Sequence, residues 1–373
     1  MKIAVIGMGY WGPNLVRNLL TTNGVDGVLC CDVQERRLDQ MRRRFPGVEL
    51  CPSVDSLLAR TDVDGVALAT PVSTHFSLGM KALNAGKHLL IEKPFTQSTA
   101  EAETLIAAAA RHGLTLMVDH TFIYTAAVRK IKECLTNGQI GDVLYFDSVR
   151  VNLGLFQRDT NVIWDLAPHD LSIMDYLIRE RPIAVSAVGR GHFNTNEDIA
   201  YMTVTFPGNI IAHFHVNWLS PVKIRKILLG GTKLMVVYDD MEPSEKVKLY
   251  DRGVAIKGSD SVYKALVEYR TGDMFAPHVA QTEALSLMAT DFVHCIATGC
   301  RPASDALSGL HVVRLLEAAD LSLKSGGLMV PVPGNDDTPS KVTLAEMQVA
   351  AAAARQTALS RPGADAQIPQ QQH

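Results

Sequence analysis

The first twelve residues constrain the fold of this chain more than any other segment. A short apolar run at residues 2–6 leads into Gly7-Met8-Gly9-Tyr10-Trp11-Gly12, and a helical pattern follows at residues 13–21. In such a strand–turn–helix unit Gly7 allows a tight turn, Gly9 lets a pyrophosphate approach the backbone, and Gly12 lets helix and strand pack closely. The positive end of the helix favours the same anion. The sequence therefore predicts a dinucleotide site, with Tyr10 and Trp11 beside the cofactor.

Apolar runs alternate with helical segments over the first 120 residues. The runs lie at residues 2–6, 27–31, 65–69, 88–91 and 114–118, and the helices between them at 13–21, 35–44, 74–85 and 98–112. Strands that are apolar throughout and separated by helices are typical of a parallel sheet buried on both faces. Ser98 and Glu101 match a capping box at the start of the last helix. We expect a doubly wound α/β domain, of the Rossmann type, at residues 1–121.

Asp32 indicates which dinucleotide binds. It ends the second strand, twenty residues after Gly12, where a carboxylate accepts hydrogen bonds from a ribose and repels a 2′-phosphate. NAD is therefore expected, with NADP as the alternative because Arg36 and Arg37 lie nearby. Ligands of such sheets lie outside the carboxyl ends of the strands. The other expected cofactor contacts at that edge are Thr70, Pro71, His75, Glu92 and Lys93.

The pattern changes after residue 120. A helix is expected at residues 126–136, ending in the turn Asn137-Gly138, and strands that alternate apolar and polar residues follow. These strands lie at 143–152, 183–193, 199–206, 209–218, 224–238 and 246–251, and two helices follow at 281–298 and 306–324. We expect an α+β domain with a large, mostly antiparallel sheet at residues 122–332.

Residues 333–373 are expected to be an extension of different character. The sequence turns to Pro, Gly, Asp and Ser after Pro331, then becomes rich in alanine at residues 344–358, and ends in GADAQIPQQQH. The alanine-rich stretch favours a helix, and the last dozen residues favour a mobile tail.

Composition excludes several classes of partner. The formal net charge is -3 and the pI is near 6.5, so there is no basic field to hold nucleic acid. No segment reaches the roughly 18 apolar residues of a membrane span, and the opening residues lack a signal-peptide pattern. Six cysteines without metal-ligand spacing favour reduced, buried thiols and a cytoplasmic location, and this applies to the adjacent Cys30 and Cys31. His213 and His215 share a strand face but lack a third ligand, so no metal is expected.

Four motifs carry a resemblance to a known family. GMGYWG, ATPVSTH, AGKHLLIEKP and DLAPH, taken together, resemble the glucose-fructose oxidoreductase and inositol dehydrogenase family over roughly residues 1–330. The resemblance implies an open sheet used for oligomer contacts, and hence a homodimer or homotetramer. It also implies a catalytic lysine, aspartate and histidine, which map to Lys93 in EKP and to Asp165 and His169. The segment 161–164 lacks the glycines usual before that aspartate, so the local backbone is expected to differ.

The residues themselves are compatible with this chemistry. Pro168 fits the first turn of a helix, which therefore should begin near Asp165. His169 would then lie near a helix N-terminus, where the dipole keeps imidazole neutral and able to accept a proton. Lys93 would hold the substrate oxygen by its charge. The alternatives are an N-cap role for Asp165, a hydrogen-bonded core position for His169, and an ion pair of Lys93 with Glu92.

The string NLGLFQRDTNVIWDLAPHD resembles the branch of this family that acts on UDP-linked N-acetylhexosamines. The resemblance implies an NAD-dependent 3-dehydrogenase of UDP-N-acetylglucosamine, whose keto product passes to an aminotransferase in lipopolysaccharide or lipid A biosynthesis. Expected substrate contacts are Lys93, Tyr124, Arg150, Asn152, Arg158, Trp164, Asp165 and His169, with Lys223 and Arg225 as further cations near the cleft.

Two other interpretations stay open. A keto-sugar reductase or a cyclitol dehydrogenase of the inositol type would need the same lysine, aspartate and histidine. A non-catalytic NAD-binding regulator would keep the glycine loop alone, because that loop establishes only that a dinucleotide is held.

Overall fold

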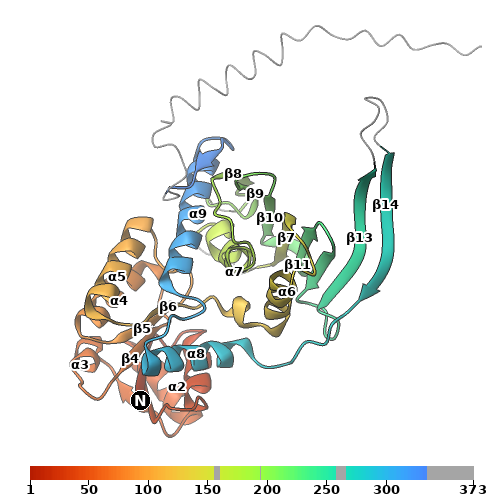
Figure 1. Ribbon diagram of the computed structural model, residues 1–373. Helices are drawn as coiled ribbons and strands as arrows, with labels where there is room; N and C mark the ends of the chain where they lie inside the picture. Colours follow the sequence, from red (N-terminus) through yellow and green to blue (C-terminus); the bar gives the residue numbers. More distant parts are fainter. Residues whose placement is uncertain (155–159, 194, 258–265, 334–373) are drawn as a thin grey trace, which may run out of the picture. The chain divides into compact units, whose positions relative to one another are not determined.

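The computed structural model describes residues 1–333 except 155–159, 194 and 258–265 (Figure 1). The alanine-rich segment and the tail expected at the end of the chain lie outside the described residues. In the described part, no helix is long and apolar enough to cross a bilayer.

The first sheet is parallel and doubly wound, as predicted. Its order is β3-β2-β1-β4-β5-β6, so the order reverses between β1 and β4. The strands are β1 (Lys2–Ile6), β2 (Gly27–Cys31), β3 (Glu49–Cys51), β4 (Gly65–Leu68), β5 (His88–Ile91) and β6 (Leu116–Val118). Only β3 was missed, because it is three residues long, partly exposed and without an apolar run.

Helices cover this sheet, four of them at the predicted places and two short ones, at residues 54–58 and 72–74, where none was predicted. They are α1 (Gly12–Leu20), α2 (Glu35–Arg44), α3 (Val54–Leu58), η1 (Val72–Thr74), α4 (His75–Asn84) and α5 (Thr99–His112). The Ser98 hydroxyl accepts the N–H of Glu101 at 3.3 Å, and the Glu101 carboxylate accepts the N–H of Gln97 at 3.0 Å. The capping box therefore exists with its return bond displaced by one residue.

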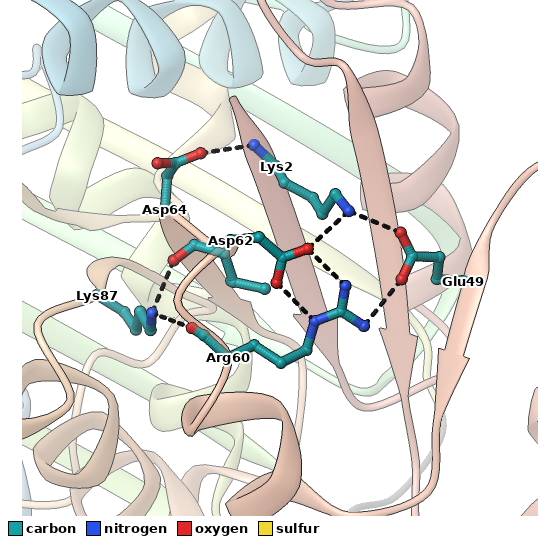
Figure 2. Close-up of polar contacts among 7 residues, drawn as sticks. Lys2, Glu49, Arg60, Asp62, Asp64 and Lys87 are labelled. Carbon is teal, nitrogen blue, oxygen red and sulfur yellow. Dashed lines mark hydrogen bonds and ion pairs between the residues drawn. The ribbon is translucent and has the colours of Figure 1, made fainter.

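An ion-pair network fastens the amino ends of the strands (Figure 2). Lys2 at the start of β1 donates to Glu49 at 2.9 Å and to Asp62 at 2.8 Å, and Arg60 pairs with both carboxylates. Lys87, just before β5, donates to the carbonyl oxygen of Arg60 at 2.6 Å. The network stabilises the edge of the sheet opposite the glycine loop, so it leaves the carboxyl edge free for ligands.

The second sheet is mostly antiparallel, as expected. In the described residues its order is β14-β13-β12-β11-β7-β10-β9-β8-β15, and only β7 and β10 pair in parallel. The strands are β7 (Val143–Leu153), β8 (Ala184–Arg190), β9 (Ile199–Thr205), β10 (Ile211–Asn217), β11 (Leu219–Gly231), β12 (Met235–Asp239), β13 (Val247–Lys257), β14 (Leu266–Phe275) and β15 (Val330–Pro331). Figure 1 shows β13 and β14 as a long hairpin.

The single strand predicted at residues 224–238 is wrong. It is two strands, β11 and β12, joined by a turn in which the N–H of Gly231 donates to the carbonyl oxygen of Leu234 at 3.1 Å. Apolar residues on both sides of the turn resemble one continuous strand in the sequence. The adjacent glycines Gly230 and Gly231 were the turn signal.

The remaining helices are η2 (Thr121–Tyr124), α6 (Ala126–Thr136), α7 (Val162–Leu177), α8 (Ala284–Thr298) and α9 (Ala306–Lys324). The start of α7 near Asp165 is a wrong prediction. Asn161 caps the helix by accepting the N–H of Trp164 at 3.1 Å, so Pro168 lies inside the helix and not in its first turn. A side-chain cap decides the start of this helix more strongly than the preference of proline for the first turn.

Helix α8 belongs late in the sequence but completes the core of the first half. Its buried Met288 and Phe292 pack in one apolar cluster with Leu15 and Leu19 of α1 and with Ile3 of β1. On the other side, α9 contacts α5. Helix α9 also contacts β8 and α7, so it joins the two sheets into one unit.

Candidate active site

The three glycines of the nucleotide loop differ in what surrounds them. A Cβ on Gly7, whose φ is +99°, would lie 2.5 Å from the carbonyl oxygen of Ala69, and one on Gly12 would lie 2.0 Å from that of Gly7. A Cβ on Gly9 would meet nothing within 4 Å. Gly7 and Gly12 are therefore required by the protein's own packing, whereas Gly9 leaves open space beside the N-terminus of α1. This open space fits a pyrophosphate.

Asp32 braces the same loop. Its buried carboxylate accepts the N–H of Met8 at 2.7 Å and that of Gln34 at 2.8 Å, and Arg37 Nη1 lies 3.3 Å from the Oδ2 that Met8 uses. Tyr10 is exposed over 83% of its surface and Trp11 over 44%. Asp32 thus shapes the loop in addition to any contact with a ribose.

His75 lies beneath the two loops at the carboxyl ends of β4 and β5. Its buried ring places Nε2 at 2.9 Å from the carbonyl oxygen of Thr70 and Nδ1 at 3.0 Å from that of Pro94. Burial lowers the pKa of His75, so the neutral ring donates to one of these two oxygens. Thr70 also accepts a hydrogen bond from the Thr74 hydroxyl at 2.7 Å, and Pro71 is exposed beside it. His75 therefore ties the loops together.

A cavity of about 430 Å³ opens at the carboxyl edge of the first sheet. Side chains from both halves of the chain line it, so a ligand in it contacts both. They are Trp11, Asn14, Arg17, Glu92, Lys93, Asp119, Thr121, Phe122, Thr125, His169, Arg225, Glu283, Ala284 and Leu285.

Lys93, which lines this cavity, is held by Asp165. Lys93 Nζ donates to the carbonyl oxygen of Asp165 at 3.0 Å and lies 3.6 Å from its Oδ1. The other carboxylate oxygen of Asp165 accepts Nε1 of Trp218 at 3.0 Å. Asp165 therefore fixes the direction of the lysine ammonium, and Trp218 in turn fixes Asp165.

His169 lines the cavity one helical turn after Asp165. Its Nδ1 is buried without a hydrogen-bond partner, which leaves Nε2 as the nitrogen available to a ligand. The pKa of His169 lies well below its usual value because the ring is buried and because Lys93, Arg150 and Arg225 place positive charge around it. The ring is neutral as predicted, but the predicted reason is wrong. His169 lies seven residues beyond Val162, so burial and cations act in place of the helix N-terminus.

Glu92 and Asp119 form a buried carboxyl pair beside Lys93. They directly follow β5 and β6 and line the cavity, and Asp119 accepts the hydroxyl of Thr121. Burial raises the pKa of both carboxyls, that of Glu92 most strongly. Burial therefore favours the neutral form of each carboxyl more than water does. Sequence reasoning missed Asp119, although its place at the end of a parallel strand was an available signal.

Several expected substrate contacts lie elsewhere. Tyr124 is fully buried and donates to Asp291 at 2.6 Å, away from the cavity. Trp164 donates to Asp320 at 2.9 Å and lines a different pocket. Both aromatic side chains therefore bind other parts of the protein, as such side chains commonly do.

The expected cations are also redistributed. Arg150 is buried in a two-bond ion pair with Asp170, at 2.6 and 2.9 Å, and stacks 4.5 Å above the Phe122 ring. Arg225 lines the cavity. Asn152 and Lys223 are not among the lining residues, and Arg158 lies outside the described residues.

The rim of the cavity holds an ion pair that no local pattern predicts. Arg17 of α1 donates to both carboxylate oxygens of Glu283, at 2.9 and 2.5 Å. The two residues are 266 positions apart, so only the packing of α8 on α1 brings them together.

His213 and His215 lie on the exposed side of β10. The ring of Tyr201 stacks on His215 at 4.6 Å, and Nδ1 of His213 lies 3.3 Å from Asp147. In the described part of the chain, no group of three His, Cys, Asp or Glu residues has metal-site geometry.

Comparison with known proteins identifies the family. The oxidoreductase family with an NAD-binding Rossmann fold matches residues 1–120, and the GFO/IDH/MocA C-terminal domain matches residues 128–237. The chain belongs to the GFO/IDH/MocA oxidoreductase family. It is an NAD-dependent dehydrogenase that acts on a CH–OH group. The family resemblance and the cofactor predicted from the sequence are both confirmed.

Two of the similar proteins are dehydrogenases of a nucleotide sugar and of a sugar. UDP-N-acetylglucosamine 3-dehydrogenase of Acidithiobacillus ferrooxidans is 28% identical over 84% of this chain and 94% of its own. D-apiose dehydrogenase of Paraburkholderia graminis is 24% identical over 87% and 88%. A crystal structure of the Acidithiobacillus enzyme superimposes with a TM-score of 0.72 over 87% of this chain and 98% of the other, at 26% identity.

Proposed function

We propose that this chain oxidises the 3-hydroxyl of UDP-N-acetylglucosamine, and that Lys93, Asp165 and His169 form the catalytic group. The observation that supports this most directly is that Lys93 and His169 line one cavity beside the nucleotide loop, while Asp165 holds the ammonium group of Lys93. The 28% identity to a UDP-N-acetylglucosamine 3-dehydrogenase, over nearly the full length of that enzyme, supports the choice of sugar.

In this mechanism His169 is the general base. Its neutral Nε2 takes the proton of the sugar hydroxyl, and Lys93 holds the same oxygen as it becomes a carbonyl. Asp165 positions Lys93 through two oxygens and does not itself exchange a proton. NAD supplies the acceptor of the hydride when bound. Residues 1–121 would hold the cofactor and residues 122–332 the sugar.

Substitution of the base and of the lysine tests the assignment. His169→Ala and Lys93→Met should retain NAD affinity, measured by calorimetric titration, and lose turnover by about 10²–10⁴-fold, because general acid–base groups contribute about that much. His112→Ala, at the exposed end of α5, is the matched control and should turn over normally. Near-normal turnover in His169→Ala would overturn the proposal.

A substrate panel tests the sugar separately. NADH formation should be fastest with UDP-N-acetylglucosamine and slower with UDP-N-acetylgalactosamine, free N-acetylglucosamine, D-apiose and myo-inositol. Reduction of the product with borodeuteride should place deuterium at C3. Faster oxidation of D-apiose would favour the second relative's activity. An aminotransferase would then consume the 3-keto sugar, because the oxidised carbon is ready for imine formation.

A further inference from the structure

Two cysteines with no recognisable spacing meet at the end of α8. Cys295 lies in the last turn of the helix and is buried, whereas Cys300 follows the helix and is exposed. Their Sγ atoms are 2.8 Å apart. This is far closer than two unbonded sulfur atoms usually lie, and a movement of under about 1 Å would reach the length of a disulfide bond.

The helix cap explains why the sulfur atoms meet. Gly299 adopts the left-handed conformation at φ +72°, and its N–H donates to the carbonyl oxygen of Cys295 at 2.9 Å. This cap folds the chain back over the last helical turn. Cys300, directly after Gly299, then contacts Cys295, which lies four residues before Gly299. That contact is usually between two apolar side chains, and here both positions are cysteine.

The two thiols have different access to reagents. Cys300 is exposed and so can be reached from solvent. Cys295 donates to Asp291 Oδ1 at 3.7 Å, and burial raises the pKa of its thiol. Cys295 therefore stays protonated and protected until a partner sulfur beside it is activated.

We propose that Cys295 and Cys300 form a peroxide-responsive disulfide site. The Cys300 thiolate attacks hydrogen peroxide, giving a sulfenic acid and one water after protonation. The Cys295 sulfur then attacks the sulfenic sulfur, forming the S–S bond and releasing a second water. Two thiols and one peroxide thus give one disulfide and two waters, and Cys295 keeps Cys300 from irreversible oxidation.

The site lies at the opposite end of α8 from the cavity. Glu283, Ala284 and Leu285 line the cavity, whereas Cys295 and Cys300 border the other end of the helix. Asp291 lies between them, and it holds the Tyr124 hydroxyl and the N–H of Ala303 through its other oxygen. Because neither cysteine touches the cavity, the proposal is independent of the sugar and of the catalytic assignments.

Mass spectrometry of the intact chain tests the proposal. After treatment with a small excess of hydrogen peroxide, the wild-type chain should lose 2 Da, and peptide mapping should link Cys295 to Cys300. Dithiothreitol should restore both thiols. Peptide mapping is needed because Cys51 is half-buried beside Cys31 and is a competing thiol.

Two variants separate the roles of the sulfur atoms. In Cys295→Ser, Cys300 should gain 32 Da as sulfinic acid, and dithiothreitol should not reverse this. In Cys300→Ser, Cys295 should remain alkylatable after unfolding. The proposal is overturned if both wild-type thiols still alkylate after peroxide treatment, or if Cys300 gains 32 Da at the same rate with and without Cys295.

Discussion

Gly9 and Gly12 serve the same loop, but the structure separates their roles. Gly9→Ala should fold with normal stability, because its Cβ would meet nothing within 4 Å, and should lose NAD affinity by at least about tenfold because the methyl group enters the space for the pyrophosphate. Gly12→Ala should lower the midpoint of urea unfolding, because its Cβ would lie 2.0 Å from a backbone oxygen. NAD titration and urea unfolding measure the two effects. Normal NAD affinity in Gly9→Ala would place the pyrophosphate elsewhere.

His120 makes the protein sensitive to acid. Both ring nitrogens are buried without partners, and burial lowers the pKa of His120 from 6.5 to about 4, with Asp175 raising it and Lys93 lowering it less strongly. The unfolded chain therefore binds a proton between pH 6.5 and 4 that the folded chain does not. The stability due to neutral His120 is fully present above pH 6.5 and is lost as pH falls to 4. Each pH unit removes about 1.4 kcal/mol, or about 3 kcal/mol in all.

Replacement of the ring isolates this effect. His120→Phe should flatten the dependence of unfolding free energy on pH between 6.5 and 4, measured by urea unfolding at several pH values. His112→Phe, on the exposed end of α5, should leave the dependence unchanged. An unaltered slope in His120→Phe would assign the acid sensitivity to other groups.

At the scale of elements, one buried ion pair joins β7 to α7. Arg150 of β7 and Asp170 of α7 are 3% and 2% exposed, and Ser148 donates to the same carboxylate at 2.8 Å. Arg150→Met should lower the unfolding free energy by about 3–5 kcal/mol, because Asp170 is left buried and charged without its partner. Adding Asp170→Leu should recover most of that loss. If Arg150 instead bound the substrate diphosphate, the single variant would raise KM and leave stability unchanged.

The start of helix α7 depends on its side-chain cap more than on the position of its proline. Pro168 pointed to a helix start near Asp165, but Asn161 supplies a side-chain cap one turn earlier. Because α7 begins earlier than predicted, His169 lies about two turns from the helix N-terminus and away from the positive end of the helix dipole. Its neutral state depends instead on burial and on three cations from other elements, which no sequence window contains.

At the scale of the whole molecule, α8 holds the nucleotide half together. Phe292 is fully buried against α1, so Phe292→Ala should lower the unfolding free energy by about 3–5 kcal/mol and weaken NAD binding through α1. Phe275→Ala, a half-exposed phenylalanine on β14, is the matched control. Unfolding and NAD titration measure both effects. Normal stability in Phe292→Ala would mean that residues 1–121 do not need α8.

The sequence alone determined the nucleotide-binding fold, the alternation of most of its strands and helices, the cofactor and the family. These follow from patterns that are short in sequence: the glycine spacing at Gly7, Gly9 and Gly12, continuous apolar strands, and Asp32 after the second of them. It also named Lys93, Asp165 and His169, but through a family motif, because nothing local indicates that residues 72 positions apart meet.

Only the tertiary structure decided which polar side chains face the cavity. Three side chains with suitable chemistry bind carboxylates of the protein instead of facing the cavity, because buried polar groups must find partners. The pairs are Tyr124 with Asp291, Arg150 with Asp170, and Trp164 with Asp320. Asp119, Arg17 and Glu283 reach the site through strand ends and helix packing. Composition and spacing report which groups a chain possesses. Burial and long-range pairing then decide which of those groups remain free to act.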